Sequence, residues 1–500
     1  MSASREKKKR QEQVPGVETT AEAKKGMSKG LKTVLGIVTA LVLVAVVVFF
    51  AMVNSGYFEK YSTAATVNGH KITPAMANYY YSNAYASMGE MLSYFADTEV
   101  PMDEQECSLM ADGSTWADYF MDTAMRNAAT TYSIYDAAIA DGFTLSEESA
   151  AAIYSELSTT EMMATLYGYA NADAVIAAQY GRGCDQASYE EFLTINYTAQ
   201  EYANKIAEGF TYTQADIDAY YAANAADFDG YTYRIFEFLA ETEGEDATVT
   251  EDALAAAEEA AKAMAEAAQG DEQAFIDLAL ENAAEDAKAT YEDPAATLCE
   301  DYTAAAMIDA YEGWVTDSAR VSGDTTYVLN TNETGYIVVY FVGAVDHNYQ
   351  LPNVRHILIG VDDTTDTAAM EEAKAKAEAL LDEFLAGEAT EDAFAALVAD
   401  NTTDTGSAEN GGLYEAIAPG TMVTAFNDWC FDEARQAGDT GIVETEYGYH
   451  IMFFSGMSDT TYHNYSVENA MLNADYTAWQ EEVTADPSIE IVSMKYIETR

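Results

Sequence analysis

The chain of 500 residues is too long for a single compact core, and its hydrophobic share of 49%, with 12% aromatic residues, excludes an intrinsically disordered protein. Twenty-four Lys and Arg residues oppose 85 Asp and Glu residues, which gives a net charge of −61. A surface this acidic repels phosphate backbones, so the composition excludes nucleic-acid binding, and we interpret the excess of acid as a solvated surface.

The N-terminal segment predicts a membrane anchor. Residues 33–53 form an uncharged apolar run of 21 residues, which at about 1.5 Å per residue spans a hydrocarbon layer of about 30 Å. A cleaved signal peptide, the alternative, has a shorter apolar core and a small-residue cleavage site, whereas this run ends in Phe-Phe-Ala-Met-Val, and no cysteine near its end offers a lipid attachment point. Nine basic and four acidic residues precede the run. The positive-inside rule therefore predicts a single-pass protein of the cell membrane, with residues 1–32 as a basic cytoplasmic tail, residues 33–53 as a transmembrane signal anchor and residues 54–500 outside the membrane.

A helical domain is predicted to follow, over residues 60–228. It begins with two short strand pieces around the turn Asn68-Gly69, a pair that accepts positive φ readily. Thr73 then has the position of a helix N-cap, with Pro74 as the first helical residue, where a missing N–H costs nothing. From there to about residue 225 the chain is rich in Ala and Tyr and has helical periodicity.

The cysteines indicate neither a metal site nor a redox pair. Cys107, Cys184, Cys299 and Cys430 lie 77, 115 and 131 residues apart, spacings that match no metal knuckle or redox motif. Cys107 and Cys184 could form a disulfide within one domain, but buried free thiols are the favoured interpretation.

Residues 229–346 and 350–456 are predicted to be two copies of one domain. The segment Trp314–Thr325 aligns with Trp429–Thr440 at an offset of 115 residues, and Arg234 matches Arg355 at an offset of 121. A repeat of this length is a domain rather than a solenoid unit. In the second copy the pattern predicts a strand over 354–360, an amphipathic helix over 373–385, a helix capped by Thr390, and closing strands over 441–443 and 449–455.

The C-terminal residues 457–500 are predicted to contain a helix over about 466–483 and a strand over 489–496, and we expect this segment to pack on the helical domain.

Two of the five histidines, His356 and His450, lie in the middle of apolar strands. Strand alternation places His356 on one face with Val354 and Leu358, and His450 on one face with Met452 and Phe454. A single histidine in such a place is more typical of a core than of a catalytic site, but two of them in one domain require a joint explanation.

The second copy resembles the parvulin type of peptidyl-prolyl cis/trans isomerase in four successive segments. They are Val354–Ile359 (Val-Arg-His-Ile-Leu-Ile), Asp404–Gly412 (Asp-Thr-Gly-Ser-Ala-Glu-Asn-Gly-Gly), Gly420–Met422 with Phe426, and Tyr447–Ile451 (Tyr-Gly-Tyr-His-Ile), which span about 105 residues. The order of anchor, helical domain and repeats is similar to that of extracytoplasmic foldases of the PrsA and SurA kind. The resemblance implies a multidomain α+β protein with an N-terminal transmembrane helix, a helical chaperone-like domain and two parvulin-like βαααββ-type domains.

The same resemblance implies roles for eight residues. Met422 and Phe426 would form a cup for the proline ring, although their i, i+4 spacing would also suit a plain core contact. His356 and His450 would be the paired histidines beneath the cup, and either Asp404 or Thr405 would be the acidic or thiol group that faces the amide. The family often has Gly-Gly-Asp-Leu-Gly where this chain has Gly-Gly-Leu-Tyr-Glu at 411–415, so Leu413 and Tyr414 would enter the cup and alter its shape.

The first copy departs from the pattern. Ile235 replaces His356 and Ile337 replaces His450, and residues 289–306 contain no glycine to match the glycine-rich loop. We therefore expect a degenerate domain that holds a client or acts as a spacer.

The resulting hypothesis is a membrane-anchored isomerase and foldase that acts on X-Pro bonds of unfolded, newly secreted polypeptides without metal or cofactor. No basic cluster flanks the site, which makes a preference for phosphorylated substrates unexpected. The alternative is a membrane-tethered holdase that binds extended chains without significant turnover. A surface adhesin or structural protein has little support.

Overall fold

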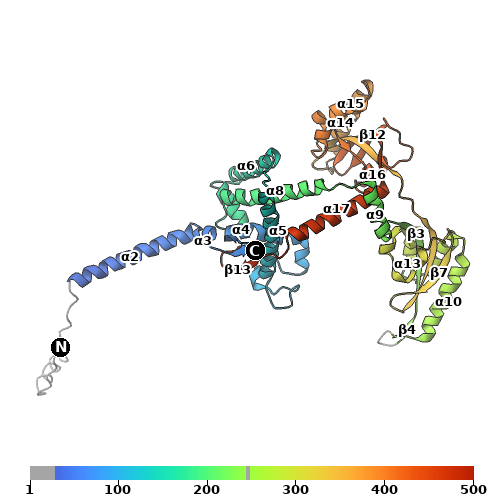
Figure 1. The fold of residues 1–500 in the computed structure, drawn as a ribbon, viewed down its shortest axis with the longest axis horizontal. Helices are drawn as coiled ribbons and strands as arrows, with labels where there is room; N and C mark the ends of the chain where they lie inside the picture. Colours follow the sequence, from blue (N-terminus) through green and yellow to red (C-terminus); the bar gives the residue numbers. More distant parts are fainter. Residues whose placement is uncertain (1–28, 244–247, 500) are drawn as a thin grey trace, which may run out of the picture. The chain divides into compact units, whose positions relative to one another are not determined.

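The computed structural model describes residues 29–243 and 248–499 (Figure 1). The chain divides into two compact units, one formed by residues 1–206 together with 479–500 and the other by residues 207–478. We call the described parts of these the helical unit and the two-sheet unit. The division falls at residue 206, inside the range 60–228 expected for the helical domain, so α9 (Gln214–Asn224) is part of the two-sheet unit.

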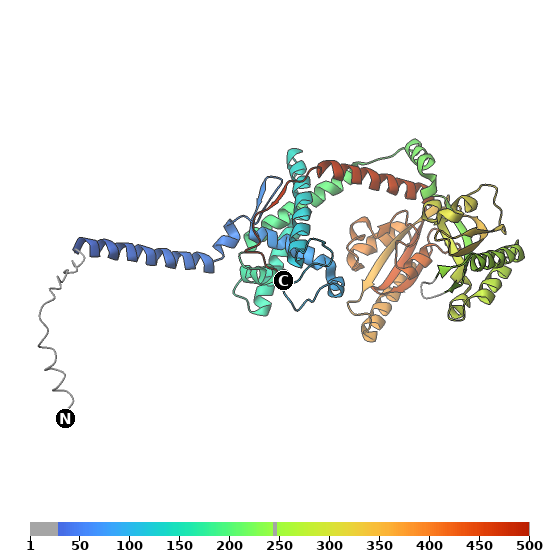
Figure 2. The same ribbon diagram turned by 90° about the horizontal axis from the view of Figure 1, so that it is seen from below.

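The helical unit begins with α2 (Lys29–Asn54), which extends away from the rest of this unit (Figure 2). Its segment Ile37–Asn54 has a mean hydropathy of 2.8 and contains no buried residue, so it is long and apolar enough to cross a membrane. It is the only such helix among the described residues. The predicted span over 33–53 therefore coincides with a helix, whereas residues 1–28 of the predicted basic tail lie outside the described residues.

The hairpin that opens the folded part follows the sequence prediction closely. Strands β1 (Ala65–Val67) and β2 (His70–Ile72) pair antiparallel around Asn68 and Gly69, whose φ angles are 49° and 84°. The hydroxyl of Thr73 accepts a hydrogen bond from the backbone N–H of Met76 at 3.2 Å and caps α4 (Pro74–Met88). The predicted turn and cap are confirmed.

Helices build the rest of this unit around one aromatic core. Trp116 and Phe120 of α5 pack with Tyr79 and Tyr81 of α4 in a continuous buried cluster. The remaining elements are α3 (Tyr57–Tyr61), α5 (Trp116–Ala140), α6 (Glu147–Tyr167), α7 (Ala172–Tyr180), α8 (Gln186–Gly209) and the 3₁₀ helices Gly89–Tyr94 and Met102–Glu104.

The chain returns to the helical unit at its C-terminal end. After α17 (Tyr462–Val483), strand β13 (Ile489–Ile491) pairs antiparallel with β1, which gives a three-stranded sheet of order β13-β1-β2. The strand predicted over 489–496 is thus shorter than expected: beyond Ile491 the backbone N–H groups of Val492 and Ser493 both bond to the carbonyl of Ala64, which ends the ladder. All four cysteines are free, and Cys107 and Cys184 are buried.

The two-sheet unit contains two antiparallel sheets with the same strand order, β6-β3-β8-β7 and β10-β9-β12-β11. The first is built from β3 (Gly230–Leu239), β6 (Leu298–Thr303), β7 (Thr325–Leu329) and β8 (Gly335–Ala344), with α10 (Glu251–Ala268), α11 (Glu272–Asn282), α12 (Lys288–Tyr291) and α13 (Asp309–Val315). The second is built from β9 (Gln350–Gly360), β10 (Leu413–Tyr414), β11 (Thr440–Thr445) and β12 (Gly448–Thr461), with α14 (Thr367–Ala386), α15 (Glu391–Asn401) and α16 (Thr424–Cys430). A small ribbon, β4 (Thr242–Glu243) with β5 (Thr248–Val249), and the 3₁₀ helices Ala225–Asp227, Pro294–Thr297, Ala304–Ala306 and Ala408–Asn410 complete the unit.

Glycines at equivalent positions of the two sheets allow the same close strand contact. A Cβ on Gly335 would lie 2.3 Å from the carbonyl oxygen of Phe238, and a Cβ on Gly448 would lie 2.3 Å from that of Ile359. Because no side chain can occupy that space, only glycine fits at the start of β8 and of β12.

The second sheet separates two cores. Ile357 of β9 and Ile451 of β12 pack with α14 and α15 on one face, while Val354 and Met452 pack with Phe426 of α16 on the other. The predicted alternation is therefore confirmed, and the histidines of β9 and β12 face α16. Thr390 caps α15 as predicted, whereas β9 and β12 extend further than expected, to Gln350 and Thr461.

Candidate functional site

A cavity of about 340 Å³ lies on the α16 face of the second sheet. Its lining side chains come from β9, β10, β12, α16 and three loops, and are His356, Leu358, Asp404, Tyr414, Thr421, Met422, Val423, Phe426, Tyr447 and His450. Six of the eight residues predicted from the sequence are among them. The other two are not: Thr405 is exposed on the loop, and Leu413 precedes Tyr414 on β10, so its side chain points to the opposite face of that strand.

The floor of the cavity is formed by Phe426, which is only 2% exposed. Its ring meets the His356 ring edge to face at a centroid distance of 5.4 Å and the His450 ring at 5.3 Å. Met422 lies in the loop just before α16 rather than within that helix. Phe426 thus belongs to the core cluster on this face of the sheet and also lines the cavity, while its role as a proline cup stays a prediction.

The two histidines contact each other directly. Nδ1 of His356 lies 3.1 Å from Nδ1 of His450, and both side chains are buried, with 3% and 5% of their surface exposed. Burial lowers the pKa of His356, and burial together with the charge of His356 lowers the pKa of His450 to about 4. Both imidazoles are therefore neutral at pH 7.

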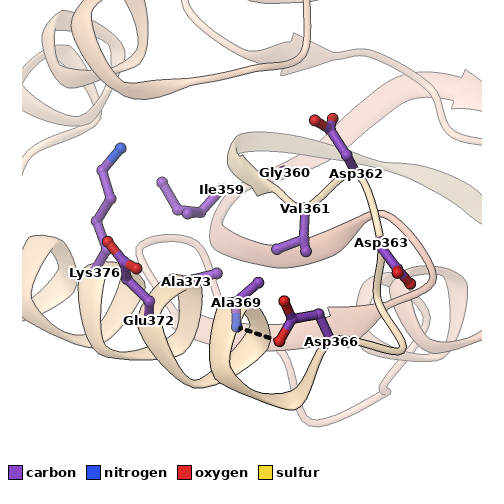
Figure 3. A pocket seen from close by; sticks show the side chains of 10 residues that line it. All are labelled: Ile359, Gly360, Val361, Asp362, Asp363, Asp366, Ala369, Glu372, Ala373 and Lys376. Carbon is purple, nitrogen blue, oxygen red and sulfur yellow. Dashed lines mark hydrogen bonds between the residues drawn. The ribbon is translucent and has the colours of Figure 1, made fainter.

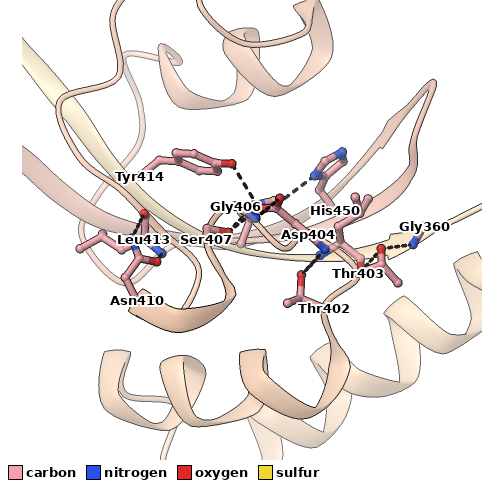
Figure 4. Close-up of polar contacts among 12 residues, drawn as sticks. Gly360, Thr402, Thr403, Asp404, Gly406, Ser407, Asn410, Leu413, Tyr414 and His450 are labelled. Atoms are coloured by element: carbon pink, nitrogen blue, oxygen red, sulfur yellow. Dashed lines mark hydrogen bonds and ion pairs between the residues drawn. The ribbon is translucent and has the colours of Figure 1, made fainter. Parts of the chain in front are cut away.

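Asp404 determines the direction of this hydrogen-bond chain. Its Oδ2 lies 2.8 Å from Nε2 of His356 and accepts further hydrogen bonds from the hydroxyls of Ser407 and, at 3.1 Å, Tyr414 (Figure 4). Burial opposes ionisation of this carboxyl, but the hydrogen bonds from Ser407 and His356 outweigh it and lower the pKa of Asp404 to about 2. An ionised carboxylate only accepts, so the proton of His356 resides on Nε2.

The remaining protons follow from that assignment. Nδ1 of neutral His356 is an acceptor, so Nδ1 of His450 carries a proton and donates it. Nε2 of neutral His450 is then an acceptor, and it accepts a hydrogen bond from the hydroxyl of Thr445 at 2.8 Å. The result is one directed chain of hydrogen bonds from Thr445 through both histidines to Asp404.

Arg355 fixes the loop that carries Asp404. Its Nη1 donates to the carbonyls of Asn410 and Gly411 at 2.8 and 2.9 Å, and its Nε donates to Glu391 at 2.8 Å. The loop reaches β9 through Gly412, where a Cβ would lie 2.3 Å from the carbonyl oxygen of His356 and where φ is 74°. Only glycine permits this approach, which explains the glycine pair of the motif.

Comparison with known families agrees with this geometry. Residues 341–455 match the model of the family described as the PPIC-type PPIase domain. This segment is a parvulin-type peptidyl-prolyl isomerase domain. We call residues 341–455 the isomerase domain. No curated protein matches the chain.

Solved structures of peptidyl-prolyl isomerases called PrsA are also similar to the chain. The protein from Bacillus cereus is 25% identical, covers 30% of this chain and 55% of its own, and has a TM-score of 0.19. The proteins from Bacillus anthracis and Bacillus subtilis are 17% and 14% identical, cover 48% and 79% of this chain and 84% and 98% of their own, and have TM-scores of 0.18 and 0.31. The chain thus spans about half the length of the first of these relatives.

Several contributors to the site of the isomerase domain were missed from the sequence. Ser407 lies within the loop motif, but its 1% exposure and its hydrogen bonds to Asp404 and His356 appear only in the fold. Thr445 could have been found from the hairpin register, because it pairs with Gly448 two residues before His450. Leu358 was expected on the face of His356 and Tyr447 within the last of the four motif segments, but neither was expected as a cavity residue.

A larger hollow of about 470 Å³ lies elsewhere in the isomerase domain, between the end of β9 and the start of α14 (Figure 3). Two of its acidic residues accept hydrogen bonds from neighbouring residues of the same loop and helix. Asp366 caps α14 by accepting from the N–H groups of Ala368 and Ala369, and Asp363 accepts from the N–H and hydroxyl of Thr365. None of the predicted site residues lines this hollow.

Proposed function

We propose that the isomerase domain accelerates cis/trans isomerisation of X-Pro bonds in unfolded, exported polypeptides, and that the protein is a foldase at the outer face of the cell membrane. The observation that carries the proposal is that one cavity places the apolar side chains of Met422 and Phe426 beside the ionised carboxylate of Asp404. The first two would hold the proline ring, and Asp404, rather than the exposed Thr405, would face the amide. Tyr414 would complete the cup.

The chemistry of the reaction suits these residues. Rotation about an X-Pro bond meets a barrier of about 20 kcal/mol, because the resonance of the planar amide is lost in the twisted state. That resonance places negative charge on the carbonyl oxygen, so a nearby carboxylate and apolar walls disfavour the planar form relative to the twisted one. No bond is made or broken, and the reaction needs neither metal nor cofactor.

His356, His450 and Thr445 would act as positioning residues. Their directed hydrogen bonds hold Asp404 ionised and in one orientation, which is the preorganisation that electrostatic stabilisation requires. Neutral imidazoles also add no positive charge that would cancel the field of the carboxylate.

The location rests on the apolar helix α2 and on the excess of Lys and Arg in residues 1–32, which would remain in the cytoplasm. The identical strand order of the two sheets supports a degenerate parvulin fold for residues 229–346. There Ile235 and Ile337 occupy the histidine positions, and Tyr311 packs beneath the sheet with its hydroxyl 3.4 Å from that of Tyr233. This copy would hold an extended client chain or act as a spacer, and it would lack a proline cup.

The test is the exchange rate between cis and trans Ala-Pro-Phe peptide, measured by NMR with the full-length protein in lipid nanodiscs. We expect acceleration by the parent and a loss of about tenfold or more in the variant with His356→Ala and His450→Ala. The matched control changes Ile235→Ala and Ile337→Ala in the first copy and should retain the parent rate. No acceleration by the parent, with binding to an unfolded protein intact, would replace the proposal by the holdase alternative.

A further inference from the structure

Aromatic rings connect the membrane-type helix α2 to the folded part of the helical unit. The ring of Phe49 in α2 lies 6.1 Å from that of Phe58 in α3, and Phe58 stacks on Tyr496 with centroids 5.9 Å apart and an interplanar angle of 8°. Tyr57 lies 5.7 Å from Phe58 and 4.9 Å from Tyr61. We call Tyr57, Phe58, Tyr61 and Tyr496 the collar.

Part of the collar is open to solvent. Tyr61 is 61% exposed and Tyr57 is 42% exposed, while Val492, whose N–H bonds to Ala64 just beyond α3, is 54% exposed. Large apolar side chains that share a small surface in this way usually mark a contact with a partner or a membrane.

The few cations of the helical unit gather at the collar. Residues 55–206 and 479–499 contain 26 Asp and Glu but only six Lys and Arg. Two of the six, Arg126 and Lys205, contact other parts of the unit. The other four contact α3 or the ring stacked on it, and they are Lys60, Lys71, Arg182 and Lys495.

Two of these four cations bond to uncharged groups. The ammonium of Lys71 donates to the carbonyl of Tyr61 at 2.6 Å, and that of Lys495 lies 5.0 Å from the centre of the Tyr496 ring. Both side chains are exposed, and neither contact neutralises their charge. Lys60 and Arg182, by contrast, pair with Asp185 and Glu59. An otherwise acidic unit therefore presents two unneutralised positive charges beside the exposed tyrosines of the collar.

The distance along the chain places the collar at the membrane surface if α2 spans the bilayer. Only Ser55 and Gly56 separate α2 from α3, and Gly56 turns the chain with φ of 71°. Two linking residues reach at most about 10 Å, and the headgroup layer on one side of the hydrocarbon is about 5–8 Å deep. Tyr and Trp are enriched at this depth because their rings are apolar at one end and polar at the other.

We propose that the collar binds the headgroup layer of the bilayer, with its tyrosines at the hydrocarbon boundary and Lys71 and Lys495 on anionic lipid phosphates. This inference rests on the proposed membrane anchor. In this proposal α3 and the C-terminal segment form a lipid-binding surface. This surface fixes the helical unit on the membrane, whereas a flexible tether would leave the unit free to move.

The experiment uses the full-length protein in nanodiscs of phosphatidylcholine and phosphatidylglycerol whose acyl chains carry bromine close to the headgroups. Tyr61→Trp introduces an indole into the collar, and the matched control Tyr154→Trp introduces one at a tyrosine of α6 that is 74% exposed in the same unit. We expect the brominated lipid to quench the fluorescence added at position 61 severalfold more than that added at position 154. Both variants should keep the parent's prolyl isomerase activity.

A second pair of variants tests the charge. Lys71→Glu with Lys495→Glu should reduce the quenching at position 61, whereas Arg126→Glu with Lys205→Glu, the same change in charge away from the collar, should leave it unchanged. Equal quenching at positions 61 and 154 would overturn the inference, as would a blue-shifted but unquenched indole at position 61, which would indicate a protein partner. Failure of the parent to co-elute with nanodiscs would overturn the anchor and the collar together, while the activity assay reports on the isomerase separately.

Discussion

Nδ1 of His356 lies 3.1 Å from Nδ1 of His450, although the two residues are 94 positions apart in the chain. Only one of the two nitrogens can carry a proton, because two N–H groups at this distance would repel each other. Asp404 decides which one by holding a proton on Nε2 of His356. The contact therefore needs an unprotonated Nδ1 on His356, and acid that protonates this nitrogen breaks it.

Acid should destabilise the isomerase domain for this reason. The pKa of His450 is about 4 in the folded protein and about 6.5 when unfolded, so the unfolded state binds more protons as the pH falls. The contribution of His450 to the free energy of unfolding is complete above about pH 6.5. It is lost as the pH falls toward 4, to an extent on the order of 3 kcal/mol. Met452 is fully buried opposite His356 and becomes accessible when the domain unfolds. The extent of its oxidation as a function of urea concentration therefore measures the free energy of unfolding at each pH. His450→Asn should flatten the pH dependence over this window, and parallel curves for parent and variant would contradict the assignment.

Replacing Asp404 should reduce catalysis far more than replacing its neighbour. Asp404→Asn removes the charge and replaces one carboxylate oxygen with an NH2 donor, which weakens the hydrogen bonds from His356, Ser407 and Tyr414, so we expect kcat/KM for an X-Pro peptide to fall about tenfold or more. Thr405→Val alters an exposed side chain outside the cavity and should keep the parent rate. Equal losses in the two variants would place the acidic role elsewhere.

Phe426→Ala should abolish binding of prolyl peptides, because it removes the apolar floor of the cavity. Truncation of a buried phenylalanine costs about 3–5 kcal/mol, so Phe426→Leu serves as the milder variant and should weaken binding while circular dichroism stays unchanged. The control is Tyr311→Ala at the equivalent position of the first copy, which should leave peptide binding intact. Titration of a labelled peptide by fluorescence anisotropy provides the measurement, and unchanged binding in both Phe426 variants would rule out the cup.

Arg355 should matter for turnover rather than for substrate binding. Lysine keeps the charge but cannot donate to Glu391 and to two loop carbonyls at once, so Arg355→Lys should loosen the loop that carries Asp404. We expect kcat to fall severalfold with KM nearly unchanged. Arg234→Lys breaks the matching Arg234–Glu272 contact in the first copy and should alter neither constant. A change confined to KM would contradict this positioning role.

The four cysteines should titrate as free thiols. In urea without a reductant, a thiol reagent should label four sites per chain, whereas a disulfide between Cys107 and Cys184 would leave only two. In the native protein Cys299, the half-buried one, should react first, because Cys107, Cys184 and Cys430 are buried. Peptide mapping by mass spectrometry identifies the labelled sites.

Much of the isomerase domain was readable from the sequence because its signals are local. Strand alternation predicted the face on which His356 and His450 lie, and the order of the motifs predicted that Asp404, Met422 and Phe426 lie in one site. The side chains that were missed depend on loop conformation. Ser407 turns inward to bond with Asp404 and His356 while Thr405 is exposed, and no periodicity encodes this loop conformation.

The ends of the strands could not be predicted from the sequence either. β12 continues to Thr461 through two register shifts that a period-2 pattern does not predict. The short strand β13 ends where backbone bonds to Ala64 replace the ladder, a long-range contact without a local sequence signal.

The pairing of β13 with β1 determines the order in which the parts of the protein can fold during synthesis. Ser488 donates to the side chain of Asn68, and the N–H of Glu498 donates to Asn78, so the core of the helical unit includes residues that follow the isomerase domain in the chain. During synthesis the isomerase domain is a continuous segment that can fold as soon as it emerges. The helical unit must instead wait, with its first strand unpaired on one edge, until the chain beyond residue 488 has been synthesised. The isomerase domain would then be assembled before the part of the molecule in which β13 pairs with β1.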